Sequence, residues 1–363
     1  MSGERNRGLN VVSIGGGTGL STLLSGLKHH VAKESPPTDR SGLPWIDTLT
    51  AVVTVTDDGG SSGRLREEFQ ILPPGDIRNC MVALAEDEAL LTKLFQYRFE
   101  SDGDLSGHSF GNLFVLALAG VTGDFLEAIK VTSEVLAIKG RIFPSTTEDV
   151  ALVAQLEDGR IIQGETRIVE SRSRIKRLWL SREHCKPLPE TLEAIKHADI
   201  ITVGPGSIFT SILPNLLVDG IVEAIRDSDA VRFLVCNLMT QPGESEDFSV
   251  EDHLQALFDY RPDLELDYVL VNTAPVSAAL RDRYRADGAI SVAFRTEQYF
   301  PPEGHDAAFR TVQLGFPRVR AICSSLLSEH EVVRHDPQKL TRLLLDVYCM
   351  CRNTAGSNRL IDS

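Results

Sequence analysis

The sequence predicts an α/β fold of the Rossmann-like type, with three layers and a mostly parallel sheet. Residues 11–27 read VVSIGGGTGLSTLLSGL, in which a β-branched run, a glycine turn and leucines at helical spacing follow one another. This order predicts a buried strand, a tight turn and a helix. Further segments of the same kind end in tips rich in Gly, Asn, Asp or Ser, at 57–63, 204–207, 237–244 and 272–273. Because ligands bind beyond the carboxyl ends of parallel strands, we expect these tips to meet over one cleft.

The glycine turn after the first strand predicts an anion site. Gly16, Gly17, Thr18 and Gly19 stand where the following helix begins, and the free N–H groups of a helix N-terminus attract phosphate. The turn is neither a dinucleotide fingerprint, since Leu20 replaces its third glycine, nor a Walker A loop. The alternative is a turn that only packs the helix on the strand, and we favour the phosphate site.

Composition limits the classes of function. The 363 residues carry a net charge of −14, 42% are hydrophobic and the pI is about 5.1, which is typical of a globular protein and disfavours nucleic-acid binding. The six cysteines are scattered and predict reduced thiols rather than a disulfide framework. The N-terminus has no signal-peptide pattern, and the longest apolar run, 110–121, is too short to span a bilayer. We expect a cytoplasmic protein without membrane insertion.

Periodicity then places the elements along the chain. A single α/β domain is expected over 9–345, with a β-rich excursion at 141–185 and a polar tail at 352–363. The excursion contains Asp158-Gly159, which predicts a hairpin. The loop at 29–48 precedes the second strand, which should be parallel to the first. The remaining strands are expected at 49–56, 198–203, 231–236, 268–272, 290–294 and 311–314, and the later helices at 113 onward, 127–138, 188–197 and 339–351.

The tip of the second strand places two carboxylates close to the expected phosphate site. Asp57 and Asp58 are followed by two glycines and by Ser61 and Ser62. Adjacent acids would repel a phosphate unless they contact ribose hydroxyls or hold a cation, for which Mg²⁺ is suited to carboxylate oxygens. The alternative is a turn that caps the next helix, since Asp, Gly and Ser also favour that role. We favour the functional interpretation.

Two further segments carry polar groups. Gly107 to Asn112 opens an apolar helix and supplies His108 as a titratable imidazole and Asn112 as an amide, although a single histidine is more often structural. Residues 171–186 hold six basic side chains, which fit either an anionic partner or, as we favour, a solvated hairpin face.

Taken together, the motifs resemble a known family. GGGTGL, TVTDDGGSSGRLR, PPGDIRN, GHSFGNLF, VGPGSIFTSILPNLLV, CNLMTQPGE and RHDPQKL follow one another from about residue 10 to residue 345. They are similar to the bacterial gluconeogenesis-factor (YvcK-like) proteins, relatives of 2-phospho-L-lactate transferase. The resemblance implies a cytoplasmic CofD-like fold that binds UDP-N-acetylglucosamine. It also implies a role in carbon metabolism, cell-wall synthesis and cell shape, without an established reaction.

The resemblance assigns roles to particular residues. It puts Thr18, Asn237 and Arg334 in ligand binding, and it places Asp57 and Asp58 where the transferase relatives hold metal and substrate. The longer loop at 29–48 and the added tail after residue 345 depart from the family pattern. Neither departure touches a motif.

Two hypotheses of different classes follow. The first is a regulator that binds a UDP-sugar or other nucleotide, needs no cofactor, and leaves open a homodimer and a protein partner from cell-wall synthesis. The second is an Mg²⁺-dependent transferase of the phospholactyl type, with Asp57, Asp58 and His108 as its candidate catalytic residues. No nucleophile–base pair is visible from spacing, so the first is favoured. Its expected ligand-binding residues are Gly16, Gly17, Thr18, Gly19, Ser61, Ser62, Asn112, Gly204, Ser207, Asn237 and Arg334.

Overall fold

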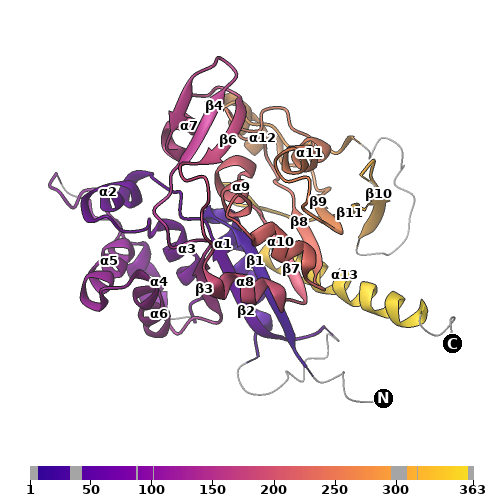
Figure 1. The fold of residues 1–363 in the computed structure, drawn as a ribbon. Helices are drawn as coiled ribbons and strands as arrows, with labels where there is room; N and C mark the ends of the chain where they lie inside the picture. Colours follow the sequence, from indigo (N-terminus) through magenta and orange to yellow (C-terminus); the bar gives the residue numbers. More distant parts are fainter. Residues whose placement is uncertain are drawn as a thin grey trace.

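The computed structural model has a central sheet of eight strands (Figure 1). The structure describes residues 7–32, 43–86, 89–100, 102–295, 309–316 and 318–358. The order of the strands across the sheet is β10-β11-β9-β8-β7-β1-β2-β3, and all neighbours are parallel except the pair β10 and β11. The strands are β1 (Leu9–Gly15), β2 (Ile46–Val53), β3 (Arg141–Pro144), β7 (Ile200–Val203), β8 (Val231–Val235), β9 (Tyr268–Asn272), β10 (Arg310–Gln313) and β11 (Arg320–Ser324).

Strand β1 lies at the point where the strand order reverses. Val12 of β1 pairs with Thr50 of β2 on one side and with Ile201 of β7 on the other. From β1 the chain continues to β2 and β3 on one side, then returns to β7, β8 and β9 on the other. The parallel pairing predicted for the first two strands is confirmed. In open α/β sheets this reversal is the place where ligands bind.

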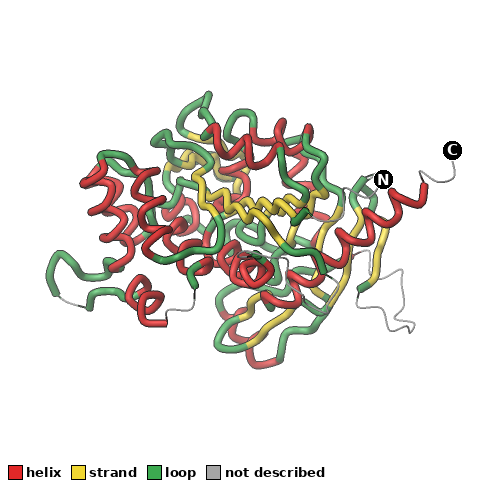
Figure 2. The backbone as a smooth tube through the Cα atoms, turned by 90° about the horizontal axis from the view of Figure 1, so that it is seen from below, coloured by secondary structure: helices red, strands yellow, loops and turns green. Residues whose placement is uncertain are grey.

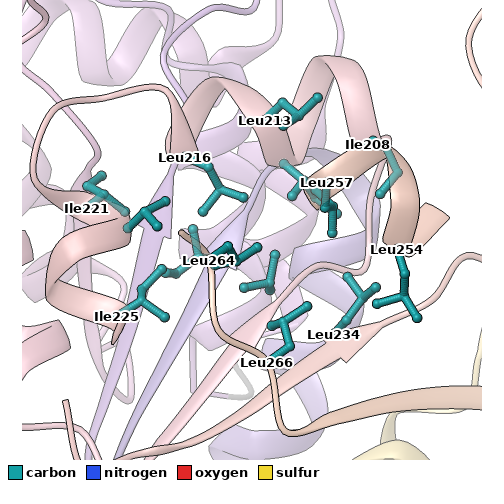
Figure 3. Close-up of a cluster of buried hydrophobic side chains, with 14 of the residues drawn as sticks. Ile208, Leu213, Leu216, Ile221, Ile225, Leu234, Leu254, Leu257, Leu264 and Leu266 are labelled. Atoms are coloured by element: carbon teal, nitrogen blue, oxygen red, sulfur yellow. The ribbon is translucent and has the colours of Figure 1, made fainter. Parts of the chain in front are cut away.

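Helices cover both faces of the sheet, as the three-layer prediction requires (Figures 1 and 2). Alternate residues of β1 serve different cores: Val11 packs with the first helix layer, whereas Val12 and Ile14 pack with the second. The first layer contains α1 (Gly17–Leu27), α3 (Gly75–Leu84) and α13 (Pro337–Asn358). The second contains α8 (Pro189–Lys196), a π-helical turn (Ile208–Ile212), α9 (Leu213–Leu216), α10 (Ile221–Asp227) and α11 (Val250–Tyr260), whose leucines and isoleucines interlock in Figure 3.

Four helices gather at one side of the molecule, away from the C-terminal half (Figure 1). They are α2 (Gly60–Phe69), α4 (Ala89–Gln96), α5 (Phe110–Thr122) and α6 (Phe125–Val135). The rings of Phe95, Phe110 and Phe114 pack together between α4 and α5, with centroids 5.1–5.9 Å apart. This aromatic contact fixes the start of α5, where His108 and Asn112 lie.

The β-rich excursion is shorter than the sequence predicts. Residues Arg141–Pro144 pair with Thr50–Val53 of β2 and therefore belong to the main sheet. The excursion itself is an antiparallel sheet of order β5-β4-β6, made of β4 (Leu152–Leu156), β5 (Ile161–Gln163) and β6 (Ile175–Leu180), with helix α7 (Glu165–Glu170) between the last two. The hairpin at Asp158-Gly159 is confirmed, and Gly159 adopts the positive φ of 90° that such a turn favours.

Two predictions near the C-terminus are wrong. Residues 290–294 make isolated bridges, Ser291 to Met239 and Ala293 to Ser249, because their backbone bonds two different loops rather than one strand. Helix α13 continues to Asn358, past the helix end expected at residue 351. Helix α12 (Ala278–Ala286), strand β11 and the hairpin of β12 (Leu327–Glu329) and β13 (Val333–His335) were not predicted. Residues 33–42 of the expected loop and 359–363 of the tail lie outside the described residues.

Among the described residues, no single helix combines the length and apolarity needed to cross a bilayer. The segments Ile208–Leu216 and Ile221–Asp227 reach that length only as a pair bent by 76°.

The crossing of α1 and α13 gives a stability prediction. A methyl group on Gly26 would lie 2.2 Å from the carbonyl oxygen of Pro337, so Gly26→Ala should destabilise the fold by about 1–3 kcal/mol. Gly120 of α5 has open space around it, so the matched Gly120→Ala should stabilise by roughly 0.5–1 kcal/mol. Thermal unfolding of both variants tests the packing, and equal shifts in melting temperature would contradict it.

Candidate functional site

Two glycine-rich strand tips lie against each other at the point where the strand order reverses. The tip of β1 carries Gly19, and a Cβ atom there would lie only 2.4 Å from the carbonyl oxygen of Pro205, at the tip of β7. A side chain at residue 19 would therefore force the two loops apart. The N–H of Gly206 also donates to the Oδ1 of Asn237 at the tip of β8, over 3.2 Å. Three neighbouring strand tips are thus held together.

A cavity of about 620 Å³, here called the main cavity, opens over these tips. Its lining comes from residues 16–19, 205–207, 237–242 and 333–335, together with side chains from α7 and α12. Arg334 is the one arginine or lysine among the described lining residues. Its side chain is exposed and makes no hydrogen bond or ion pair with another residue in the described part of the chain, so its guanidinium is available to an anion.

The first turn of α1 forms the floor of the main cavity. The N-cap residue of the helix is Gly16, which has no side chain to bond the first N–H groups of the helix. Asp76 accepts the N–H of Gly17, and the N–H groups of Thr18 and Gly19 are left for a ligand. Thr18 is exposed there, and its hydroxyl makes no hydrogen bond within the described part of the chain. The main cavity therefore receives free N–H groups, the positive end of a helix dipole and a hydroxyl group from one turn.

Asp76 lies directly behind this turn. Its carboxyl group accepts a hydrogen bond from the N–H of Gly17, and a Cβ atom on Gly16 would lie 2.7 Å from its Oδ2. Burial, reinforced by the negative charge of Asp57, raises the pKa of Asp76 to about 7. Asp76, within the PPGDIRN motif, was not predicted as a site residue, so its contact with the glycine turn was missed. Only the three-dimensional packing of α3 against α1 brings the two together.

Asp57 and Asp58, expected to act as a pair, point into different environments. Asp57 accepts the N–H of Gly59 at 2.9 Å and hydrogen-bonds Ser62, and burial raises its pKa above the ordinary value. Asp58 accepts the N–H of Thr166 at 2.8 Å, in the first turn of α7. Asp58 therefore fastens the β-rich excursion to the tip of β2, which is a structural role.

Neither aspartate is among the described residues that line the main cavity. In the part of the chain that the structure describes, no group of three or more His, Cys, Asp or Glu side chains is arranged to hold a metal ion. A cation at Asp57 would therefore depend on oxygen ligands from a bound molecule, as is usual for Mg²⁺ at phosphate sites.

Two glutamates, Glu244, which is buried, and Glu165, which is half-buried, stand in the wall of the main cavity. Glu244 accepts a hydrogen bond from the hydroxyl of Ser207, and burial raises its pKa to about 7 against the opposing effect of that bond. Burial and then the charge of Asp57 raise the pKa of Glu165, on α7, well above its ordinary range. Neither glutamate was predicted as a site residue. Glu165 lies within the segment interpreted as a hairpin, where nothing local signals an inward-facing carboxyl.

Ser61, His108 and Asn112 form a separate buried network at the starts of α2 and α5. The Oγ of Ser61 lies 2.9 Å from the Nδ1 of His108, and the amide nitrogen of Asn112 donates to the same Oγ at 3.1 Å. Because an amide NH₂ group can only donate, the Ser61 hydroxyl proton is free to point at the imidazole. Burial, followed by the charge of Arg64, lowers the pKa of His108.

This serine–histidine pair could not be read from the sequence, because 47 residues separate its members. It is not among the described residues lining the main cavity. The predicted site residues therefore divide into two groups. The first group lines the main cavity and consists of Gly16, Gly17, Thr18, Gly19, Ser207, Asn237 and Arg334. The second group is not among the described lining residues of the main cavity. It consists of Gly204, at the base of the β7 tip, and of Asp57, Asp58, Ser61, Ser62, His108 and Asn112.

The hairpin β12–β13 places Arg334 over the main cavity. Arg334 pairs with Ser328 across the hairpin, and the neighbouring His335 is buried and hydrogen-bonds the backbone of Cys236 at the end of β8. Burial lowers the pKa of His335 to about 4, so the imidazole is neutral. This contact fixes the hairpin beside Asn237, and it explains how a residue about 100 positions later in the chain completes the site.

Comparison with known proteins identifies the class. The family model described as 2-phospho-L-lactate transferase CofD matches residues 11–305, so the chain belongs to the CofD family. Within that family, it is similar to the gluconeogenesis factors. It is 42% identical over 337 residues to the gluconeogenesis factor of Bacillus subtilis, covering 93% of this chain and 97% of that protein. It is 45% identical over 343 residues to a putative gluconeogenesis factor of Aquifex aeolicus, covering 93% and 96%.

Solved structures agree with this assignment. The crystal structure of a UPF0052-family protein from Bacillus halodurans matches with a TM-score of 0.82 and 42% sequence identity, covering 93% of this chain and 99% of that one. The family resemblance and the Rossmann-like fold predicted from the motifs are both confirmed.

The raised pKa of Asp76 gives a prediction about pH. A carboxyl whose pKa is higher in the folded state than in the unfolded state lowers stability as pH rises between the two values, here from about 4 to about 7. Asp76→Asn removes this penalty and keeps an oxygen that can accept the Gly17 N–H. The variant should therefore gain melting temperature relative to the wild-type protein as pH rises from 5 to 8. A difference that does not change with pH would contradict the assignment.

Proposed function

We propose that this chain is a cytoplasmic regulator that binds a nucleotide sugar, UDP-N-acetylglucosamine, in the main cavity. The observation that carries the proposal is the meeting of two glycine-rich strand tips, at β1 and β7, beneath the guanidinium of Arg334. Backbone N–H groups at a helix start and one arginine are a typical set of partners for a diphosphate. The regulation would concern carbon metabolism, which the name of the relatives, gluconeogenesis factor, supports. The proposal extends it to cell-wall synthesis and cell shape.

The volume of the main cavity and the charge of the protein support a small ligand. About 620 Å³ lies within the range of cavities that hold molecules of this size. The carboxyl groups of Glu165 and Glu244 line the same cavity and suit the hydroxyl groups of a sugar or ribose, which donate hydrogen bonds. A net charge of −14 and a single lining arginine disfavour a long polyanion.

A second candidate is an Mg²⁺-dependent transferase of the phospholactyl type. The observation that favours it is the proximity of Asp57 and Asp76 behind Gly17, next to the expected phosphate position. Mg²⁺ is commonly held by one or two carboxylates together with phosphate oxygens of the bound molecule. The matching family is described as 2-phospho-L-lactate transferase CofD, so a transfer reaction is a natural alternative.

Thermal-shift measurements on the full chain separate the two candidates. UDP-N-acetylglucosamine at about a hundred times its Kd should stabilise by roughly 2.7 kcal/mol, with or without Mg²⁺. Mass spectrometry should then recover the nucleotide sugar unchanged. Consumption of a nucleotide donor only in the presence of Mg²⁺ would support the transferase instead, and no stabilisation by any nucleotide would contradict both.

Two substitutions test the phosphate contacts. Thr18→Ala and Arg334→Ala each remove one hydrogen-bonding group from the main cavity, and neither residue is buried. Loss of a hydrogen bond to a charged phosphate costs about 1.5–3 kcal/mol, so Kd should rise on the order of tenfold to a hundredfold in calorimetric titration.

The matched control is Arg342→Ala, which removes an arginine that is 71% exposed on α13, away from the main cavity. It should leave Kd unchanged. Equal affinities for the wild-type protein and Arg334→Ala would exclude Arg334 from the site. Circular dichroism checks that each variant is folded.

A further inference from the structure

A second cavity adjoins the main cavity and shares two residues with it. It encloses about 340 Å³ and is here called the second chamber. Asn237 and Leu238, just after β8, line both spaces. The other walls of the second chamber come from the tip of β9, residues 271–276, and from residues 291–294. The two spaces therefore adjoin at Asn237 and Leu238.

The walls of the second chamber are fixed by hydrogen bonds. On one side, the N–H of Val292 donates to the carbonyl of Leu238 at 3.0 Å, and Val250 donates to Ala293 at 2.9 Å. On the other, the amide of Asn272 donates to the carbonyl of Ala274 at 2.8 Å, and its Oδ1 accepts the N–H of Leu326 at 2.9 Å. The chamber is thus formed before a ligand arrives, and the Asn272 side chain is already occupied.

The two spaces differ in the charged residues that line them. The main cavity is lined by Arg334 and by the carboxyl groups of Glu165, Glu244 and Asp287. Among the described residues that line the second chamber, none is Asp, Glu, Lys, Arg or His. Its walls combine valine and phenylalanine side chains with the hydroxyls of Thr273 and Ser291. Such a surface suits a flat, uncharged ring that carries a few hydrogen-bonding groups at its edge.

We infer that the second chamber receives the nucleobase of the bound nucleotide. The inference rests on the proposed function, because it assumes that the diphosphate lies over the glycine turns. With the diphosphate there, the hydroxyl-rich sugar matches the carboxyl groups of Glu165 and Glu244, and the neutral base matches the uncharged chamber. Asn237 then stands at the boundary between the two spaces, where its contact with Gly206 fixes its side chain.

The opposite orientation would place the sugar in the second chamber. A sugar presents several hydroxyl groups that each need a partner when buried. The Asn272 amide is occupied by its own loop, and the Ser291 hydroxyl donates to the Sδ of Met239 at 3.7 Å. Among the described lining residues beyond Asn237, this leaves Thr273 as the one hydroxyl group without a hydrogen-bond partner. The chamber therefore favours the base over the sugar.

A substitution that fills the chamber tests the inference. Ala293 is exposed and lines the second chamber, so Ala293→Trp adds a large ring there without replacing a core residue. Calorimetric titration would compare UDP with UDP-N-acetylglucosamine. Both should bind at least about tenfold more weakly, by the same factor, because both carry the base that the ring displaces. The matched control Ala117→Trp, at an exposed position of α5 away from both cavities, should change neither affinity.

The outcomes distinguish failure of the base assignment from failure of the proposed function. A loss of affinity for UDP-N-acetylglucosamine alone would place the sugar in the second chamber. Unchanged affinities for both ligands would place the base elsewhere. Either result overturns the inference about the base and leaves the proposed function standing. Failure of the wild-type protein to bind either ligand overturns the proposed function itself. Photo-crosslinking with 4-thio-UDP gives an independent check, since the base should label residues 271–276 or 291–294.

Discussion

The close approach of two glycine loops is the constraint on which the site depends. Gly19 leaves room for the carbonyl of Pro205, so the tips of β1 and β7 touch where the strand order reverses. Any side chain at that contact would separate the tips and widen the floor of the main cavity. Strand β1, which is buried except at Asn10 and packed by helices on both faces, holds the contact rigid. Ligand recognition is thus built on the most constrained part of the fold.

The main cavity has more carboxyl groups than cationic groups around it, which is unusual for a cavity that binds an anion. One free guanidinium, Arg334, faces a wall that contains Glu165 and Glu244, with Asp76 behind the glycine turn. Burial raises the pKa of each of these carboxyl groups, which reduces their negative charge near neutral pH. Carboxyl groups in this state can donate as well as accept hydrogen bonds, so the same wall can serve a sugar without repelling the neighbouring phosphate.

Local patterns predicted the scaffold well and the site only in part. The strand–glycine–helix order at residues 11–27 fixed β1, its turn and α1, because each step has a strong local signal. Asp57 and Asp58 looked like a pair, yet they face different neighbours because α7 folds back onto the tip of β2. Asp76, Glu165 and the Ser61–His108 contact depend on packing between distant segments, which no local pattern reveals. Residues 290–294 were predicted as a strand because hydrophobic periodicity does not show which segment the backbone will hydrogen-bond.

The most direct measurement is a crystal structure of the full chain with UDP-N-acetylglucosamine. The account predicts that the diphosphate oxygens lie within hydrogen-bonding distance of the N–H groups in the first turn of α1 and of the Arg334 guanidinium, in the main cavity. Density for the diphosphate at another surface, with the β1 and β7 tips and Arg334 free of contacts, would contradict the central claim.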